Sequence, residues 1–303
     1  MVNEKAKGIG YGLSAYLIWG SFPVVIAMLS FADPFEIVVW RVIFGFAFGF
    51  AVILLTRKFS EYLAVFRQPK QLAWITLAAI VIYINWQVYV YAVADNHVLE
   101  ASLGYFINPL VTIALATIFL KEKLNLLQWI AVGLGFVAVL VLTFNYGQTP
   151  VIALTLALSF GIYGLAKNKL GGKVSALNSF TVETTLLLPL GIIQLVFLAG
   201  IMQIQFGYAG LGPSLGLAAY GVLTAIPLLL FGAAAKRVPL SYIGFMQYLT
   251  PTLQFLLGLF LFQEPMPAAR WVGFAMVWVA LSILSFDALR QLRNRSRVVA
   301  PVA

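Results

Sequence analysis

The chain has 303 residues, of which 62% are hydrophobic and 10% are charged. A water-soluble domain cannot bury that much apolar surface, so the composition predicts a polytopic membrane protein. The absence of cysteine excludes disulfides and thiolate metal sites, and a single histidine argues against a histidine-based metal site. The net charge is +9, but the basic residues lie in short gaps between apolar runs, which favours a lipid bilayer over nucleic acid as the partner.

Ten apolar stretches are long enough to cross a bilayer, which takes about 20 helical residues. They cover residues 8–29, 35–55, 72–94, 99–119, 126–145, 149–167, 177–199, 212–234, 240–262 and 268–288. The first stretch is too long for a signal-peptide core and has no A-x-A site after it, so we interpret it as a retained span. The sequence thus predicts an all-α membrane protein with ten transmembrane helices.

The basic residues are distributed unevenly between the two sides of these predicted spans. If the N-terminus is inside, 17 of the 19 Lys and Arg residues fall in inside segments, Arg270 falls outside and Arg41 lies within a span. Cytoplasmic loops of membrane proteins carry an excess of Lys and Arg. We therefore expect both termini to be cytoplasmic.

Three residue types that are uncommon in this composition recur at a shift of 142 residues. Pro109, Glu122 and Trp129 are matched by Pro251, Glu264 and Trp271. The first copy ends in a basic turn, whereas the second has no basic residue between Glu264 and Arg270. Residues 1–146 and 147–303 are therefore predicted to be two five-helix repeats of inverted topology, a plan typical of secondary transporters.

The segments Glu100–Leu110 and Phe119–Leu124 together resemble the drug/metabolite transporter superfamily, and more narrowly the RarD-type permeases of the EamA group, which are associated with chloramphenicol sensitivity. Tyr16–Gly20 and Glu36–Arg41 fit the same pattern, and the second half fits it less well. The resemblance implies a bacterial inner-membrane protein with two inverted five-helix repeats. It also implies a central substrate cavity lined by spans 1–4 and 6–9. Family members move amino acids, sugars, nucleotide derivatives and other metabolites, often outward.

Arg41 and Glu183 are the sharpest candidates for a substrate site. Intramembrane charges usually face a cavity or a partner, and these two residues are related by the same shift of 142. We expect them to form an ion pair near the midplane, or Glu183 to be a protonatable carboxylate. Alternatively, Arg41 extends to the outer interface and Glu183 lies near the inner interface.

Further candidates are polar residues and prolines inside spans. Asn85, Trp86 and Gln87 could bind a polar substrate or form hydrogen bonds between helices. Other polar side chains in spans 4 and 9 could also line the cavity: Tyr105, Asn108, Gln247, Tyr248 and Gln254. Three prolines are expected to kink or hinge their helices: Pro109, Pro227 and Pro251.

Three glutamates lie at predicted helix ends. Glu100 is either a proton site or part of a solvated loop. Glu122 and Glu264 are expected to pair with a lysine or to cap neighbouring helix termini.

These features predict a secondary transporter of a small metabolite or drug-like molecule that works by alternating access, with export implied by the resemblance. No P-loop is present, so ATP-driven pumping is not expected, and no cofactor or metal is predicted. The alternatives are a membrane scaffold or receptor, which should carry a recognition domain, and an intramembrane enzyme, which should cluster His, Asp or Ser. The sequence is compatible with a homodimer but does not determine the oligomeric state.

Overall fold

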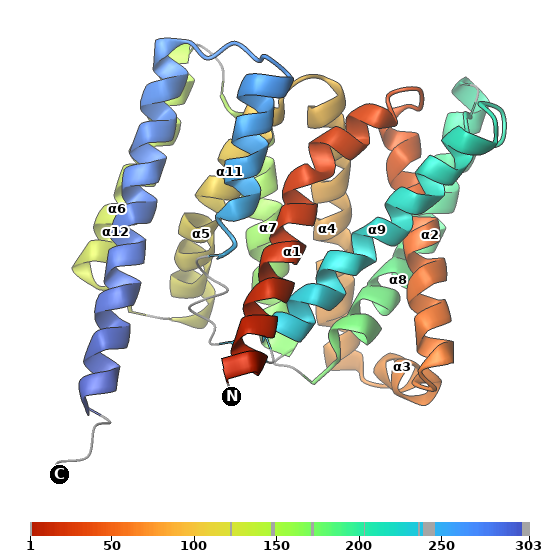
Figure 1. The fold of residues 1–303 in the computed structure, drawn as a ribbon, viewed down its shortest axis with the longest axis horizontal. Coiled ribbons are helices and arrows are strands. Elements are labelled where there is room, and N and C mark those ends of the chain that lie inside the picture. Colours follow the sequence, from red (N-terminus) through yellow and green to blue (C-terminus); the bar gives the residue numbers. More distant parts are fainter. Residues whose placement is uncertain are drawn as a thin grey trace.

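The computed structural model describes residues 2–121, 123–146, 149–170, 173–202, 204–235, 237–238 and 246–298. Within these ranges the chain folds into helices joined by short connections, without any strand. The helices stand side by side as a bundle (Figure 1). The start of α1 (Val2–Met28) and the end of α12 (Ala268–Val298) lie at the same end of this bundle.

The first half of the chain contains α1 and five further helices: α2 (Pro34–Leu55), α3 (Phe59–Phe66), α4 (Pro69–Ala94), α5 (Val98–Leu120) and α6 (Leu126–Tyr146). The second half contains α7 (Val151–Leu170), α8 (Ala176–Ile201), α9 (Leu211–Ala235), α11 (Leu249–Leu256), the π-helical segment η1 (Leu257–Leu261) and α12. In the described residues, nine helices are long and apolar enough to cross a membrane. The prediction of an all-α membrane protein is thereby confirmed.

The ninth predicted span, residues 240–262, differs from the other nine. Its described part is a shorter apolar helix, Leu249–Leu261, and residues 239–245 lie outside the described ranges. Gln247 and Tyr248 form a turn directly before α11, so Pro251 lies in the first turn of this helix. A proline has no N–H to donate and is well tolerated at that position. The helical structure is therefore interrupted just before Pro251, whereas the sequence predicts a bend inside one continuous span.

The short helix α3 lies in the connection between the second and third predicted spans. Its apolar residues recur at helical spacing, and Tyr62 and Val65 are buried. The Tyr62 hydroxyl lies 2.9 Å from the Thr185 hydroxyl, which ties α3 to α8. At eight residues α3 is too short to span a bilayer.

The helix boundaries repeat along the chain. The pairs α2 and α8, α4 and α9, and α6 and α12 start at residues 34 and 176, 69 and 211, and 126 and 268, a difference of 142 each time. The helices of these pairs run in opposite directions through the bundle (Figure 1). The packing follows the same correspondence: α1 packs on α9 as α7 packs on α4, α1 on α11 as α7 on α5, and α2 packs on α8 as α6 packs on α12.

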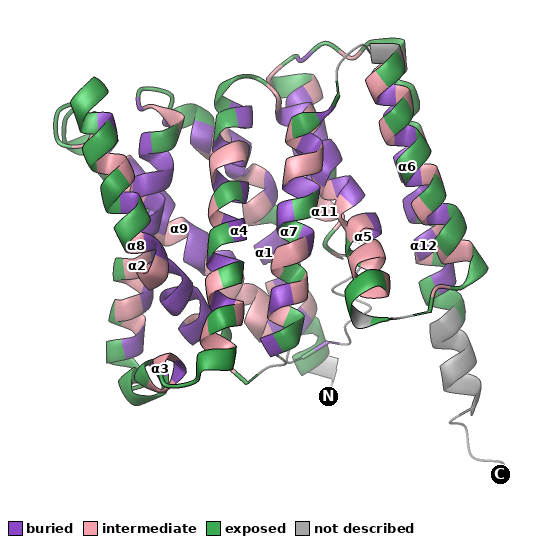
Figure 2. Cartoon of the chain, turned by 180° about the vertical axis from the view of Figure 1, so that it is seen from behind, coloured by how far each residue is buried: buried purple, intermediate pink, exposed green. Residues whose placement is uncertain are grey.

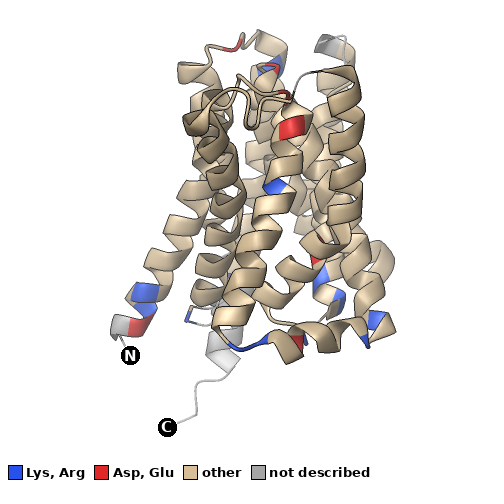
Figure 3. Cartoon of the chain, turned by 90° about the vertical axis from the view of Figure 1, so that its right-hand side faces the viewer, with Lys and Arg blue, Asp and Glu red and all other residues tan. Residues whose placement is uncertain are grey.

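The buried side chains form a large central core between α1, α2, α4 and α9 and a second core between α5, α6 and α12. Figure 2 shows buried faces turned inward and exposed faces turned outward on the same helices. Many exposed residues are large and apolar, such as Phe136, Phe144 and Phe286, as lipid contact requires. Figure 3 shows Lys and Arg concentrated at the end of the bundle that holds the N-terminus.

Candidate functional site

The site begins with α2, the helix that carries Arg41. Hydrogen bonds hold the first residues of this helix in place. Asp33 caps the helix by accepting a hydrogen bond from the Phe35 N–H, and Pro34 follows at the first helical position. The Glu36 carboxylate is fully buried and accepts hydrogen bonds from the backbone N–H groups of Gln205 and Phe206. These bonds attach α2 to the connection between α8 and α9.

Arg41 is the eighth residue of α2 and only 4% exposed, and aromatic rings surround its guanidinium. Its Cζ lies 4.1 Å from the ring centroid of Trp86, 5.2 Å from that of Tyr220 and 5.6 Å from that of Phe22. Arg41 Nη1 donates a hydrogen bond of 3.1 Å to the Tyr220 hydroxyl. We call Arg41 with Phe22, Trp86 and Tyr220 the arginine cage. It joins α1, α2 and α4 of the first half to α9 of the second.

A close helix approach brings Tyr220 to this cage. At Gly221 a Cβ atom would lie 2.6 Å from the Cβ of Phe44, so only glycine lets α9 come this near to α2. The preceding residue, Tyr220, is 1% exposed and faces Arg41. The small residue therefore positions a large polar one against the guanidinium.

No carboxylate neutralises Arg41 in the described part of the chain, where every ion pair involves other residues. Arg41 Nε is buried and has no hydrogen-bond partner. A charge inside a bilayer costs at least about 2.5–3.5 kcal/mol, and desolvated cation–π contacts each return about 2 kcal/mol. The aromatic rings therefore stabilise the cation without neutralising its charge.

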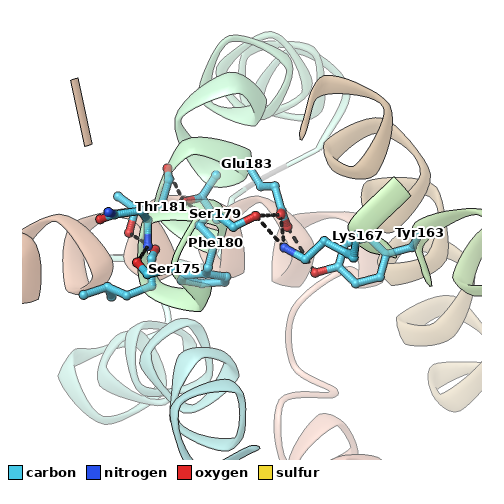
Figure 4. A network of polar contacts seen from close by, with 10 residues as sticks. Tyr163, Lys167, Ser175, Ser179, Phe180, Thr181 and Glu183 are labelled. Atoms are coloured by element: carbon cyan, nitrogen blue, oxygen red, sulfur yellow. Dashed lines mark hydrogen bonds and ion pairs between the residues drawn. The ribbon is translucent and has the colours of Figure 1, made fainter. Parts of the chain in front are cut away.

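The predicted ion pair between Arg41 and Glu183 is wrong. Glu183 is buried and accepts hydrogen bonds from Lys167 Nζ at 2.5 Å, the Ser179 hydroxyl at 2.8 Å and the Tyr163 hydroxyl at 3.3 Å (Figure 4). Each predicted partner is the eighth residue of its helix, and α2 and α8 run in opposite directions. Seven steps of 1.5 Å place Arg41 and Glu183 each about 10 Å from the start of its own helix, and the two helices start at opposite ends of the bundle. The two side chains therefore lie at different depths.

Lys167, in the last turn of α7, was missed as a site residue because its place at the end of a predicted span marks it as a loop charge. Its side chain is 26% exposed and its ammonium points at Glu183 and Ser179 (Figure 4). This places Glu183 in a paired network between α7 and α8, which is closest to the alternative of a position near one interface.

The three consecutive candidates of span 3 point in different directions, as 100° per residue in a helix requires. Trp86 joins the arginine cage. Asn85 Nδ2 donates to the Leu156 carbonyl and the Ser159 hydroxyl at 3.2 and 3.0 Å, which is the interhelical alternative. Gln87 Nε2 donates to Gln194 Oε1 at 2.7 Å, away from the cage.

Two more predicted residues adjoin the cage. The Tyr105 hydroxyl donates to Asn85 Oδ1 at 3.2 Å, and the rings of Tyr89 and Tyr105 are 5.7 Å apart. Both tyrosines pack in the same buried core as Phe22, Trp86 and Tyr220. Gln254 is 2% exposed and donates to the Tyr89 hydroxyl at 2.9 Å, while its own Oε1 has no partner.

The remaining polar candidates of spans 4 and 9 do not reach the cage. Asn108 donates to the Ala157 carbonyl at 3.2 Å and so holds α5 to α7. Tyr248 packs against the second core, and Gln247 is exposed. Pro109 and Pro227 lie inside the uninterrupted helices α5 and α9.

Two of the three predicted terminal glutamates cap helices. Glu100 accepts hydrogen bonds from the N–H groups of Ile152 and Ala153 in the first turn of α7, so it is not part of a solvated loop. Glu264 accepts from the N–H groups of Val98 and Leu99 in the first turn of α5, which confirms the capping alternative. Burial raises the pKa of Glu264, and these two N–H donors partly oppose the shift. Glu122 lies outside the described residues.

Three aromatic residues were not predicted from the sequence: Phe22 and Tyr220 of the arginine cage, and Tyr89 next to it. Their available signal was weak, because the chain has 13 tyrosines and 24 phenylalanines. Only the direction in which each helix face is turned distinguishes these rings from those that contact lipid.

Several known proteins are similar to this chain in sequence or fold. Residues 6–144 match the model of the EamA-like transporter family. Protein RarD of Streptomyces exfoliatus is 45% identical over 299 residues, covering 98% of this chain and 94% of that protein. An uncharacterized transporter of Pseudomonas aeruginosa is 41% identical over 289 residues, covering 95% of this chain and 96% of that protein. A crystal structure of another protein has the same fold, with a TM-score of 0.59 and 17% sequence identity. The match covers 94% of this chain and 99% of that chain.

A multi-pass helical bundle with polar groups at its centre, together with these relatives, defines a membrane transporter of the drug/metabolite type. The chain belongs to the RarD group of the EamA-like transporter family. Its apolar helices and its bacterial relatives make it a multi-pass inner-membrane protein.

Proposed function

We propose that this protein is a secondary transporter that carries a small molecule across the inner membrane by alternating access. Its moving parts would be two inverted repeats, residues 1–146 and 147–303. The common spacing of 142 between helix starts supports this division. So do the matching helix contacts, in which α1 packs on α9 as α7 packs on α4. Rocking of such repeats about a site between them is the usual mechanism of this architecture.

The observation that carries the proposal is the position of the arginine cage. Arg41 and Trp86 come from the first repeat and Tyr220 from the second, so a molecule bound at the guanidinium would contact both. Relative movement of α2 and α9 would change the hydrogen bond between Arg41 and Tyr220. A charged group between two moving bodies is well placed to sense the substrate during the transport cycle.

The membrane orientation forms part of the proposal. Because Lys and Arg gather at the end that holds the N-terminus, this end is proposed to face the cytoplasm. Transport would be outward, by analogy with the family.

The test is transport by the purified protein in liposomes. A panel of amino acids, organic acids, sugars, nucleosides and chloramphenicol should be loaded, and each compound followed by mass spectrometry with and without a pH gradient. Chloramphenicol is included because a Pseudomonas aeruginosa relative is named a chloramphenicol-sensitive protein. We expect flux of at least one class of compound above that of empty liposomes. Failure to move any member of the panel would contradict the proposal, and flux that ignores the gradient would exclude proton coupling.

A further inference from the structure

The arginine cage has a feature that points to the chemistry of its ligand, a buried cation that lacks a counter-charge. Arg41 is 4% exposed, and its neighbours in the described chain are rings and neutral hydroxyls. Elsewhere in the same bundle, buried carboxylates are fully engaged: Glu183 with Lys167, and Glu36 with the N–H groups of Gln205 and Phe206. Arg41, in contrast, donates one hydrogen bond to a neutral hydroxyl, and its Nε has no partner.

The guanidinium also has an unused edge. Tyr220 accepts the hydrogen bond from Nη1, whereas Nε has no partner. Nε and Nη2 form one edge of the planar group, and this edge matches the two oxygens of a carboxylate. Arg41 Cζ lies over the Trp86 ring, 4.1 Å from its centroid, so this ring contacts the guanidinium without forming a hydrogen bond to the Nε edge.

The surroundings of the cation indicate the rest of the ligand. Phe22 and Trp86 contact the guanidinium, and Tyr89 and Tyr105 pack edge to face nearby. Rings of this kind favour an apolar or aromatic body next to the charged group. An inorganic anion or a highly polar sugar phosphate would leave these surfaces without a matching contact.

We propose that the transported molecule is an organic anion whose carboxylate binds the Nε edge of Arg41 and whose apolar body lies among the surrounding aromatic rings. This inference rests on the proposed transport function and names its substrate class. It assigns Arg41 as the residue that distinguishes an acid from its neutral analogue. Trp86 and Tyr220 would hold the guanidinium in place.

The test compares carboxylates with their amides, which have the same shape and no charge. Phenylacetate, indole-3-acetate and cinnamate, each with its amide, should be titrated into the purified protein at neutral pH by isothermal titration calorimetry. We expect at least one acid to bind about tenfold or more tightly than its amide, because hydrogen bonds to charged groups are the strong ones. Equal affinity for every acid and its amide, or no binding of any acid at millimolar concentration, would overturn the inference.

Substitutions at Arg41 then assign the preference. Arg41→Gln should bring the affinity for the acid down to that for the amide, while Arg41→Lys, which keeps the charge but loses the fork, should retain part of the preference. Lys58→Gln, on the exposed turn between α2 and α3, removes the same charge and should leave the preference intact. Size-exclusion profiles and melting temperatures identify any variant that fails to fold. If Arg41→Gln fails to fold, Arg41→Lys is the conservative replacement. An unchanged preference in a folded Arg41→Gln protein, or in folded Arg41→Lys and Arg41→Met proteins, would overturn the inference.

Counterflow in liposomes separates this inference from the transport function. Arg41-dependent binding of an acid without movement of any compound would support the anion site and contradict the transporter. Movement of neutral compounds that Arg41→Met leaves unchanged, with no preference for acids, would support the transporter and contradict the anion site.

Discussion

The Cζ atom of Arg41 lies 4.1 Å from the ring centroid of Trp86, closer than to the rings of Tyr220 and Phe22. A tryptophan face is the strongest aromatic partner for a cation, and both residues are buried here. The contact links α2 to α4 within the first half and places the guanidinium where α9 can reach it.

Replacing Trp86 tests whether the ring holds the guanidinium in its functional position. Trp86→Phe keeps a weaker ring, so we expect transport to fall by less than about tenfold, whereas Trp86→Leu should reduce it by more than about tenfold. Initial rates in liposomes, corrected for the amount of inserted protein, provide the measurement. Trp129→Leu changes a ring that is 56% exposed and should have little effect. Equal rates for Trp86→Leu and the unmodified protein would contradict a role for the ring.

Removing the Tyr220 hydroxyl tests the hydrogen bond that crosses from α2 to α9. Tyr220→Phe leaves Arg41 Nη1 without its 3.1 Å acceptor, and a hydrogen bond to a charged group is worth about 1.5–3 kcal/mol. We expect a lower melting temperature in detergent and slower transport. Tyr208→Phe is the matched control, because Tyr208 is 74% exposed. An unchanged melting temperature together with unchanged transport would argue against this bond.

The network around Glu183 predicts which charge changes compensate each other. Lys167→Met leaves a buried carboxylate without its cation and should destabilise the protein by about 1–3 kcal/mol, less than a fully buried pair because Lys167 is 26% exposed. Adding Glu183→Gln should restore most of that loss. Unfolding followed by tryptophan fluorescence measures both variants.

The charge exchange of Arg41→Glu with Glu183→Arg is expected to restore nothing, because these two side chains have different partners. Recovery of transport in that double variant would mean that the two residues meet in another conformation of the cycle.

Glu264 predicts a dependence of stability on pH. Burial raises the pKa of Glu264, so the folded protein holds this proton more tightly than the unfolded chain does. The stabilising contribution is therefore complete below the unfolded pKa of about 4.5 and is lost as the pH rises through the raised folded value. In Glu264→Gln the melting temperature should decline less steeply with pH over that range, although one capping bond to the start of α5 is weakened. Parallel melting curves for the two proteins would contradict this expectation.

Much of the architecture could be predicted from local sequence, because hydrophobic length and loop charge are properties of short segments. Nine of the ten predicted spans correspond to long apolar helices, and the shift of 142 recurs in the helix starts. The short helix α3 and the interruption before Pro251 were not predicted, since α3 is too short to span a bilayer and the interruption lies inside one apolar stretch. Capping by Glu264 was one of the two roles predicted for it, because a carboxylate at a helix end can accept hydrogen bonds from a nearby helix N-terminus.

The sequence by itself determined that this protein crosses a membrane many times, that its two halves share a spacing, and that Arg41 carries a charge inside a span. The tertiary structure alone decided what those charges meet. Helix rotation and depth depend on close contacts such as Gly221 against Phe44, and these turned Arg41 towards Trp86 and Tyr220. The same packing brings Glu183 and Lys167 together as an ion pair. A one-dimensional repeat can show that two residues are equivalent, but equivalent residues on antiparallel helices need not lie at the same depth.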